Sequence, residues 1–364
     1  MTKVITFTVL SVCMVLVSAC SRDTPDKILD NYLYRLSNVL DVEKPSTLPI
    51  EIRPLFPLRR KRSAQTQEIR EGLLDTLKLR KCGLLPLIAE RNSSLGKVLQ
   101  PSLKMQYELK FLSGIEHCLE NFNQAESTDT ELMQLLQQVR TIKRANLAAE
   151  LWNGIYTSPA IEANFSRKQT PLPLESNGSH SLSLTALLTL SNLISEISDN
   201  QPLPSGRRLS QLESHYEILF KNETGSQVFT SVQLMTEYLI QASKMLNQRL
   251  NQRPLCPDGV KTEKAEILYN VFLKFYIGEV QPYLAQVHHI GEPWLHENNK
   301  LLDSFRKLGH PIPESVSNYA AAVLSTTAED SLWKNYIQAR DNHTRSWQQI
   351  LKQCGMMPSQ NNRQ

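Results

Sequence analysis

The sequence predicts an all-α protein, a multi-helix bundle of roughly ten helices with a short extended, proline-rich segment near the N-terminus. Glycine is scarce, at 13 of 364 residues, about half its usual share. Leucine, glutamine, glutamate, lysine and alanine, which favour helices, are common. Apolar residues also recur at the three- and four-residue steps of a helix through most of the chain.

Four long helices have the clearest patterns, at 129–155, 226–251, 262–287 and 328–352. Thr128 and Glu131 are typical of a capping box at the start of the first. In the second, alternating steps of four and three predict lengthwise packing against another helix, on an internal face and not at a dimer contact. Pro282 is expected to kink or end the third helix. Shorter helices are expected at 24–42, 65–79, 102–121, 181–198, 209–221, 293–307 and 314–326.

Two stretches interrupt the helices. Residues 44–62 are rich in proline, and Leu48, Ile50 and Ile52 alternate as in a strand, which proline would confine to a sheet edge. Residues 166–180 are polar and proline-containing, and they divide the chain almost evenly. We therefore expect a set of segments along the chain: a signal peptide (1–19), an N-terminal helical half (20–165), a C-terminal helical half packed with it as one globular unit (181–355), and a flexible tail (356–364).

The first twenty residues have the pattern of a lipoprotein signal peptide. Lys3 precedes an apolar stretch from Val4 to Ala19, shorter than the roughly 20 residues of a membrane-spanning helix. The sequence Val17-Ser18-Ala19-Cys20 resembles the lipobox of bacterial lipoproteins, which implies acylation of Cys20 and cleavage after Ala19. An ordinary cleaved signal or a retained anchor helix are the alternatives. Ser21, where that class uses aspartate for inner-membrane retention, implies the outer membrane, facing the periplasm.

Four cysteines remain in the mature body beyond the acylated one. They are Cys82, Cys118, Cys256 and Cys354, and an even number in an oxidising compartment predicts two disulfides. We expect Cys82–Cys118 and Cys256–Cys354, because each pair lies within one half of the chain. Other connectivities, or one bridge and two free thiols, stay open.

The charge balance excludes nucleic acid as a partner. The chain carries 40 basic and 36 acidic residues, and export argues further against such a partner. The basic run Arg59-Arg60-Lys61-Arg62 is expected to be a solvated loop before a helix; contact with anionic headgroups is the alternative.

Motifs for metal, nucleotide or catalysis are not complete. His288, Glu292 and His296 follow at four-residue steps, but Gly291 and Pro293 are expected to break the helix between them, so we expect no metal site. The turn "SSLGK" at 93–97 lacks the earlier glycine of a phosphate-binding loop, which excludes a nucleotide. No GxSxG or penicillin-binding motif is present, and we expect no cofactor and no catalytic residue.

Two blocks carry a resemblance, "LIAERNSSLGKVLQPSLKMQYELKFL" at 87–112 and "CPDGVKTEKAEILYNVFLKFYIGEVQPYLAQV" at 256–287. With the lipobox, they resemble a bacterial envelope lipoprotein family catalogued as domain of unknown function 3080. The resemblance implies an exported lipoprotein without an assigned activity. The polar residues Glu90, Arg91, Asn92 and Ser93 are the first candidate for a site, and capping of a helix end by side-chain oxygens is the alternative.

Together these features predict a membrane-anchored periplasmic lipoprotein, most simply a non-enzymatic interaction or scaffold protein of the cell envelope. Its expected partners are the membrane, through the lipid anchor, and an envelope protein or peptidoglycan. An envelope enzyme acting on peptidoglycan or lipid through an unfamiliar site is one alternative. A carrier for an apolar ligand, which needs a large cavity between helices, is the other.

Overall fold

The protein is built from helices. A computed structural model describes residues 23–46, 52–69, 77–124, 129–168, 170–175, 178–199 and 201–357. Within these ranges there is no β-strand, which confirms the predicted all-α fold. None of the helices in these ranges is both long and apolar enough to cross a bilayer.

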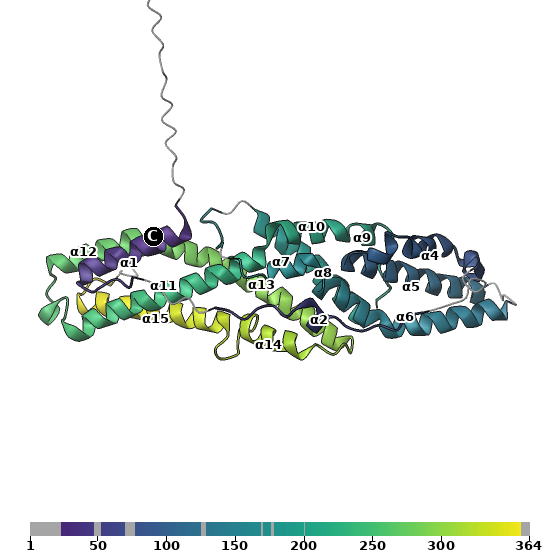
Figure 1. Ribbon diagram of the computed structural model, residues 1–364. Helices are drawn as coiled ribbons and strands as arrows, with labels where there is room; N and C mark the ends of the chain where they lie inside the picture. Colours follow the sequence, from purple (N-terminus) through teal and green to yellow (C-terminus); the bar gives the residue numbers. More distant parts are fainter. Residues whose placement is uncertain are drawn as a thin grey trace, which may run out of the picture.

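The helices form an elongated rod (Figure 1). One end contains α1 (Pro25–Leu40), α11 (Thr224–Gln252), α12 (Glu263–Val271) and α15 (Leu332–Gln353). The other end contains η1 (Leu79–Cys82), α4 (Leu85–Asn92), η2 (Gly96–Val98), α5 (Pro101–Gln124) and α6 (Thr130–Tyr156). Between and along them lie α2 (Arg59–Arg62), α7 (Pro159–Asn164), α8 (Ser179–Ser198), α9 (Arg207–Ser210), α10 (Leu212–Asn222), α13 (Gln281–Lys307) and α14 (Glu314–Val323).

Two hydrophobic cores stabilise the rod. The larger core runs from α1 to α15 and so joins residues from both halves of the sequence. The smaller core lies between η1, α4, α5 and the first turns of α6. Helix α6 belongs to both, because Leu132–Val139 lies in the smaller core and Leu147–Tyr156 in the larger. Helix α6 therefore connects the two hydrophobic cores.

Helix α1 docks onto elements far away in sequence. It packs against α11, α12 and the π-helical segment η4 (Phe272–Val280), and Leu29, Leu33 and Leu36 are fully buried there. The segment at 166–180 also packs against the body in its described part, where Leu172 is buried and its N–H donates to Ser231 Oγ at 2.8 Å. At the C-terminal end of the described chain, Met356 is buried as well.

The predicted lengthwise packing of the second long helix is confirmed. Helix α11 lies along α15, and its heptad-like stripe is buried inside the monomer (Figure 1). Phe229, Tyr238 and Met245 are buried on that internal face, as expected.

The helix neither ends at Pro282 nor breaks at Gly291 and Pro293. The chain stays helical from Glu263 to Lys307, through α12, η4 and α13. Pro282 lies at the second position of α13, directly after the wide π-helical turns, where a proline is tolerated. Pro293 lies inside α13, where the next two side chains, Trp294 and Leu295, are buried in the core, and Gly291 leaves no room for a Cβ beside Trp333.

The start of α6 differs from the sequence prediction. Asp129 is the N-cap residue, and its carboxylate accepts a hydrogen bond from Leu132 N at 3.2 Å. Thr128, expected in a capping box, lies outside the described residues. Asp129 also pairs with Lys81, which reaches it from η1.

The proline-rich segment continues as a strap, defined here as residues 52–69, that contains the short helix α2, has no other regular structure and runs along the rod. It pairs with no strand among the residues that the structure describes, and Leu48 and Ile50 lie outside them. The expected helix at 65–79 is wrong at its start, because residues 65–69 are extended. Residues 70–76 of that range are not described.

Two asparagine side chains of α6 bind the strap backbone through paired N–H and C=O hydrogen bonds, as a neighbouring strand does in a sheet. The Asn153 side chain accepts from Ala64 N and donates to Ala64 O, both at 2.8 Å. Asn146 repeats this with Gln67 N at 2.9 Å and Gln67 O at 2.7 Å. The step of seven residues from Asn146 to Asn153 rises about 10.5 Å along α6, and the step of three residues from Ala64 to Gln67 spans about 10 Å of extended chain. The spacing of the two asparagines therefore matches the spacing of the backbone groups that they bind.

The strap also buries part of the basic run, which was expected to be solvated. The Arg62 side chain is 1% exposed, while Arg59, Arg60 and Lys61 are exposed. Arg62 Nε donates to Tyr156 O at 2.6 Å, and its guanidinium pairs with Glu162 at 2.5 Å. The expectation of a solvated loop is therefore wrong for Arg62, which serves as a fastener of the strap.

Candidate functional site

The polar block proposed from the sequence ends helix α4. Ser93 Oγ donates to Glu90 O at 2.7 Å and accepts from Gly96 N at 3.0 Å, and Arg91 donates to Gly96 O at 2.5 Å. These hydrogen bonds join neighbours along the chain, and Glu90, Asn92 and Ser93 are exposed. The arrangement corresponds to the capping alternative, since these hydrogen bonds satisfy backbone groups at the end of α4.

The same hydrogen bonds fix a turn that exposes two apolar side chains. Leu95 is 80% exposed and Val98 is 75% exposed, and both lie in the short connection between α4 and α5. Gly96 is required there, because a Cβ atom would lie 2.1 Å from Glu90 O. The sequence suggested polar chemistry at this place; the structure instead presents hydrophobic surface on a braced turn.

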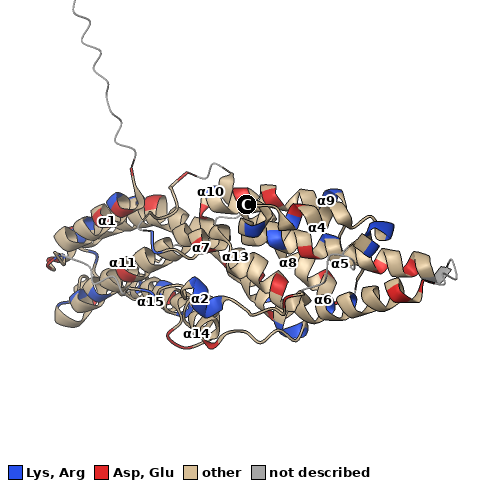
Figure 2. Ribbon diagram, turned by 45° about the vertical axis from the view of Figure 1, so that its right-hand side comes forward, with Lys and Arg blue, Asp and Glu red and all other residues tan. Residues whose placement is uncertain are grey.

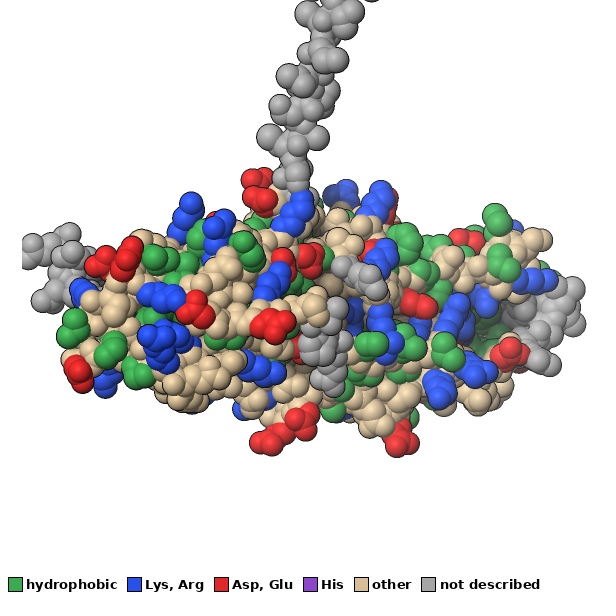
Figure 3. All heavy atoms as spheres, turned by 60° about the vertical axis from the view of Figure 1, so that its left-hand side comes forward, with side chains coloured by type: hydrophobic (Ala, Val, Ile, Leu, Met, Phe, Trp, Pro, Cys, Tyr) green, Lys and Arg blue, Asp and Glu red, His purple; other side chains and the backbone are tan. Residues whose placement is uncertain are grey.

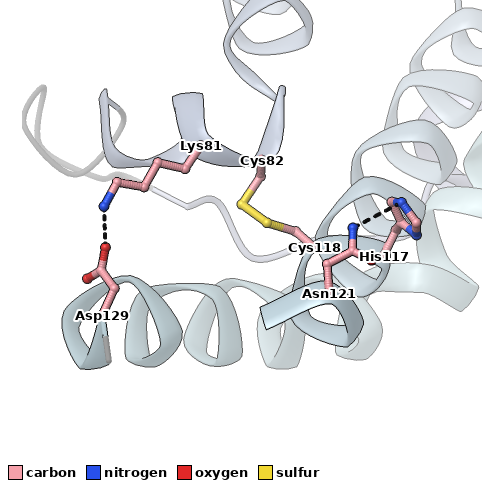
Figure 4. Close-up of a disulfide and its surroundings, with 6 residues drawn as sticks. All are labelled: Lys81, Cys82, His117, Cys118, Asn121 and Asp129. Atoms are coloured by element: carbon pink, nitrogen blue, oxygen red, sulfur yellow. Dashed lines mark hydrogen bonds and ion pairs between the residues drawn. A yellow bond between two sulfur atoms is a disulfide. The ribbon is translucent and has the colours of Figure 1, made fainter. Parts of the chain in front are cut away.

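The cysteines of the body form two disulfides with the expected pairing. Cys82–Cys118 joins η1 to α5, and Cys256–Cys354 joins the loop after α11 to the end of α15. Figure 4 shows the first bridge beside the Lys81–Asp129 ion pair, so covalent and ionic contacts fasten η1 to α5 and α6. Cys20, the expected acylation site, lies outside the described residues.

The histidine trio lies on one continuous helix, contrary to the sequence prediction. His288 Nε2 is 3.6 Å from Glu292 Oε2, and the His288 ring stacks on Trp333 at 5.3 Å between centroids. His296 instead lies near Glu297, at 3.9 Å. No group of three or more histidine, cysteine or acidic side chains suited to a metal occurs in the part of the chain that the structure describes.

A small cleft gathers polar side chains from both halves of the sequence. Its cavity volume is about 160 Å³, and the strap, α11 and α15 form its walls with Arg53, Gln233, Glu237, Asp330 and Asn335. This volume is enough for a few water molecules or one small polar group. Sequence reasoning missed Arg53, because an arginine in a proline-rich segment gives no sign of burial.

Arg53 is the most unusual side chain of this cleft. It is 6% exposed, and it donates to Gln233 Oε1 at 2.7 Å and to Ser166 O at 2.5 Å. Its Nε atom has no hydrogen-bond partner among the described residues, and burial lowers the pKa of its guanidinium. Tyr319 Oη is another buried atom without a hydrogen-bond partner among the described residues.

The most strongly perturbed histidine belongs to the core. His343 is fully buried, and burial lowers its pKa to about 3. Tyr32 Oη accepts from Trp347 Nε1 at 2.8 Å and has its own proton to donate to His343 Nε2, also at 2.8 Å. This buried chain of hydrogen bonds joins α1 to α15, while His343 Nδ1 has no partner among the described residues, and full burial keeps the ring out of reach of a substrate.

Charges of both signs are interspersed over the surface of the rod (Figure 2). Many of them form ion pairs, including Lys143–Glu108 and Arg144–Glu116 between α5 and α6, both at 2.5 Å. A single-sign field that would steer a highly charged partner is not evident in this view.

Comparison with known proteins gives one match. Residues 29–358 match the sequence profile of a protein family, DUF3080, whose description is protein of unknown function. No curated protein and no solved structure matches the chain significantly.

Proposed function

This chain belongs to the DUF3080 family, and we propose that it is a lipid-anchored protein of the bacterial envelope that holds a partner and catalyses no reaction. Acylation at Cys20 would fix it to the membrane, and Ser21 favours the outer membrane, facing the periplasm. An envelope protein or peptidoglycan is the partner class.

Two independent features support the compartment. The lipobox at 17–20 addresses the chain to export and acylation. The disulfides Cys82–Cys118 and Cys256–Cys354 suit an oxidising compartment, and each closes within one end of the rod. Cytoplasmic reductants would work against both bridges.

The observation that carries the binding part of the proposal is the braced turn between α4 and α5. Leu95 and Val98 stay exposed although the surrounding hydrogen bonds hold the turn in place. Apolar side chains on a fixed turn lose little entropy when a partner covers them, which favours binding. The turn lies in the half of the rod away from α1, so a partner there would not compete with the anchor (Figure 1).

Site-specific photocrosslinking in intact cells tests this proposal. Leu95 is replaced by photoreactive p-benzoylphenylalanine, and Leu182, an exposed leucine on α8, is replaced in the matched control. One adduct of defined mass, formed at Leu95 and absent at Leu182, is expected. The additional substitution Val98→Asp should abolish it by placing a charge in the contact. The same products from both positions, or none from Leu95, would refute the proposal.

A further inference from the structure

The distance between the acylated residue and the folded body is short. Four residues lie between Cys20 and Pro25, a connection of five Cα–Cα steps, and α1 begins at Pro25 with its first side chain buried. A fully extended chain spans at most about 3.6 Å per residue, so this connection reaches no more than about 18 Å. Helix α1 lies along the flank of the rod (Figure 1). A body held by its flank through so short a connection must bring that flank close to the bilayer.

A groove opens on this flank between α1, α12 and η4, and we call it the α1 groove. Its volume is about 710 Å³. The apolar side chains Ile267, Leu273 and Phe275 contribute to its lining, and Leu273 is 43% exposed. The neighbouring Ile277, one turn further along η4, is also exposed. The π-helical turns of η4 thus present an apolar stripe to the outside.

Cations line the same groove. Arg35, Lys264 and Lys274 are among the lining residues, which include no carboxylate. Arg35 and Lys274 both lie over the Phe275 ring, at 5.1 Å and 5.5 Å from its centroid. Lys264 pairs with Asp41 at the far end of α1.

The acidic groups nearby leave two of these cations available. Burial and the nearby charge of Asp23 raise the pKa of the Glu279 carboxyl, while Lys274 and Arg35 act to lower it. Neither of these two cations forms an ion pair with a described residue. Asp30, on the other side of α1, pairs with Lys44. In Figure 3, where the α1–α12 end comes forward, exposed hydrophobic side chains lie among basic and acidic ones.

We propose that the α1 groove faces the membrane and binds anionic phospholipid headgroups. The phosphate lies at Arg35 and Lys274, and Ile267 and Leu273 reach the boundary between headgroups and acyl chains. This inference rests on the proposed anchoring at Cys20, because the short connection is what selects a bilayer over a soluble partner. Amphipathic surfaces that combine cations with large apolar side chains bind interfaces in this way.

The test uses the full mature lipoprotein in vesicles of equal parts phosphatidylethanolamine and phosphatidylglycerol. Leu273 is replaced by p-benzoylphenylalanine, and the control position is Ile52, 75% exposed on the strap beside α11 and α15. After illumination, mass spectrometry counts phospholipid adducts. Adducts at Leu273 should exceed those at Ile52 about tenfold, because the apolar face of an interfacial element lies about 5–10 Å inside the headgroup region.

A charge variant tests the headgroup contact separately. Lys274→Gln in the Leu273 photoprobe protein should reduce the adducts about fivefold, since one basic residue near an anionic surface contributes about 1 kcal/mol. In vesicles of phosphatidylcholine alone, the same substitution should change little. An unchanged yield in the anionic vesicles would overturn the assignment of Lys274 to phosphate.

The intact mass of each preparation separates this inference from the proposed function. If Cys20 carries its acyl chains and the two positions label equally, the groove does not face the bilayer, while the anchor stands. If Cys20 is bare, the anchor itself fails, and this inference falls with it.

Discussion

Replacing Arg62 by methionine should detach the strap from the rod. The substitution keeps a similar stem but removes donors to Tyr156 O, Pro57 O and Glu162. A hydrogen bond to a charged group contributes about 1.5–3 kcal/mol, and two carbonyls lose such a donor. Glu162 is half exposed, so water replaces the lost donor and the loss of this ion pair costs little stability. Relief of the buried charge offsets part of the rest, which leaves a cost of about 3 kcal/mol.

Thermal unfolding and hydrogen exchange measure this effect. A loss of about 3 kcal/mol should lower the melting temperature by about 4 °C in a protein of this size. The amides of Ala64 and Gln67, which bond to Asn153 and Asn146, should exchange faster.

The matched control is Arg60→Met in the same basic run. Arg60 is exposed, so its loss should change stability by less than about 0.5 kcal/mol. If Arg62→Met leaves both the melting temperature and the exchange of Ala64 as they are in Arg60→Met, Arg62 is not buried as described.

Three further predictions concern the core and the bridges. Since burial lowers the pKa of His343 to about 3 from 6.5, stability should be full above pH 6.5 and fall as the pH drops toward 3, by up to about 1.4 kcal/mol per pH unit; urea titrations of His343→Gln should show a shallower fall, and parallel curves would refute this. The bridges Cys82–Cys118 and Cys256–Cys354 span 36 and 98 residues, so double alanine replacement of the second should cost about 1 kcal/mol more in chemical unfolding; an equal or smaller loss would contradict the chain-entropy argument. Gly291→Ala should cost about 1–3 kcal/mol, because its Cβ would lie 2.8 Å from Trp333, whereas Gly278→Ala, 3.4 Å from Leu273 O, should be tolerated; equal melting temperatures would count against the packing at Gly291.

Local sequence was sufficient where one period or one pairing decided the structure. The four-and-three steps of α11 required a lengthwise neighbour, and α15 supplies it. The disulfide pairing followed from placing each cysteine pair within one half of the chain, and both bridges in the structure have that pairing. These predictions needed no knowledge of distant contacts.

Distant contacts explain the failures. Pro293 carries a strong local tendency to break a helix, yet α13 continues through it with Trp294 and Leu295 buried in the core. Arg62 has the same local setting as Arg60, and only the approach of Tyr156 and Glu162 distinguishes it. A single sequence contains no sign of either approach.

At the candidate site, too, the sequence indicated local features but not those that depend on distant contacts. The density of polar residues suggested a site at Glu90–Ser93, but in the structure these residues brace a turn whose exposed members are Leu95 and Val98. Arg53 and its cleft depend on α11 and α15 meeting the strap, which no local pattern reveals. The α1 groove likewise needs α1 to dock onto helices far along the chain.

The most direct test of the account is the intact mass of the protein purified from envelopes. The account predicts a chain that begins at Cys20, carries acyl groups on that residue and retains two disulfides, and it predicts an unacylated precursor for Cys20→Ala. A wild-type chain that keeps residues 1–19, or that begins at Cys20 without acyl groups, would contradict it.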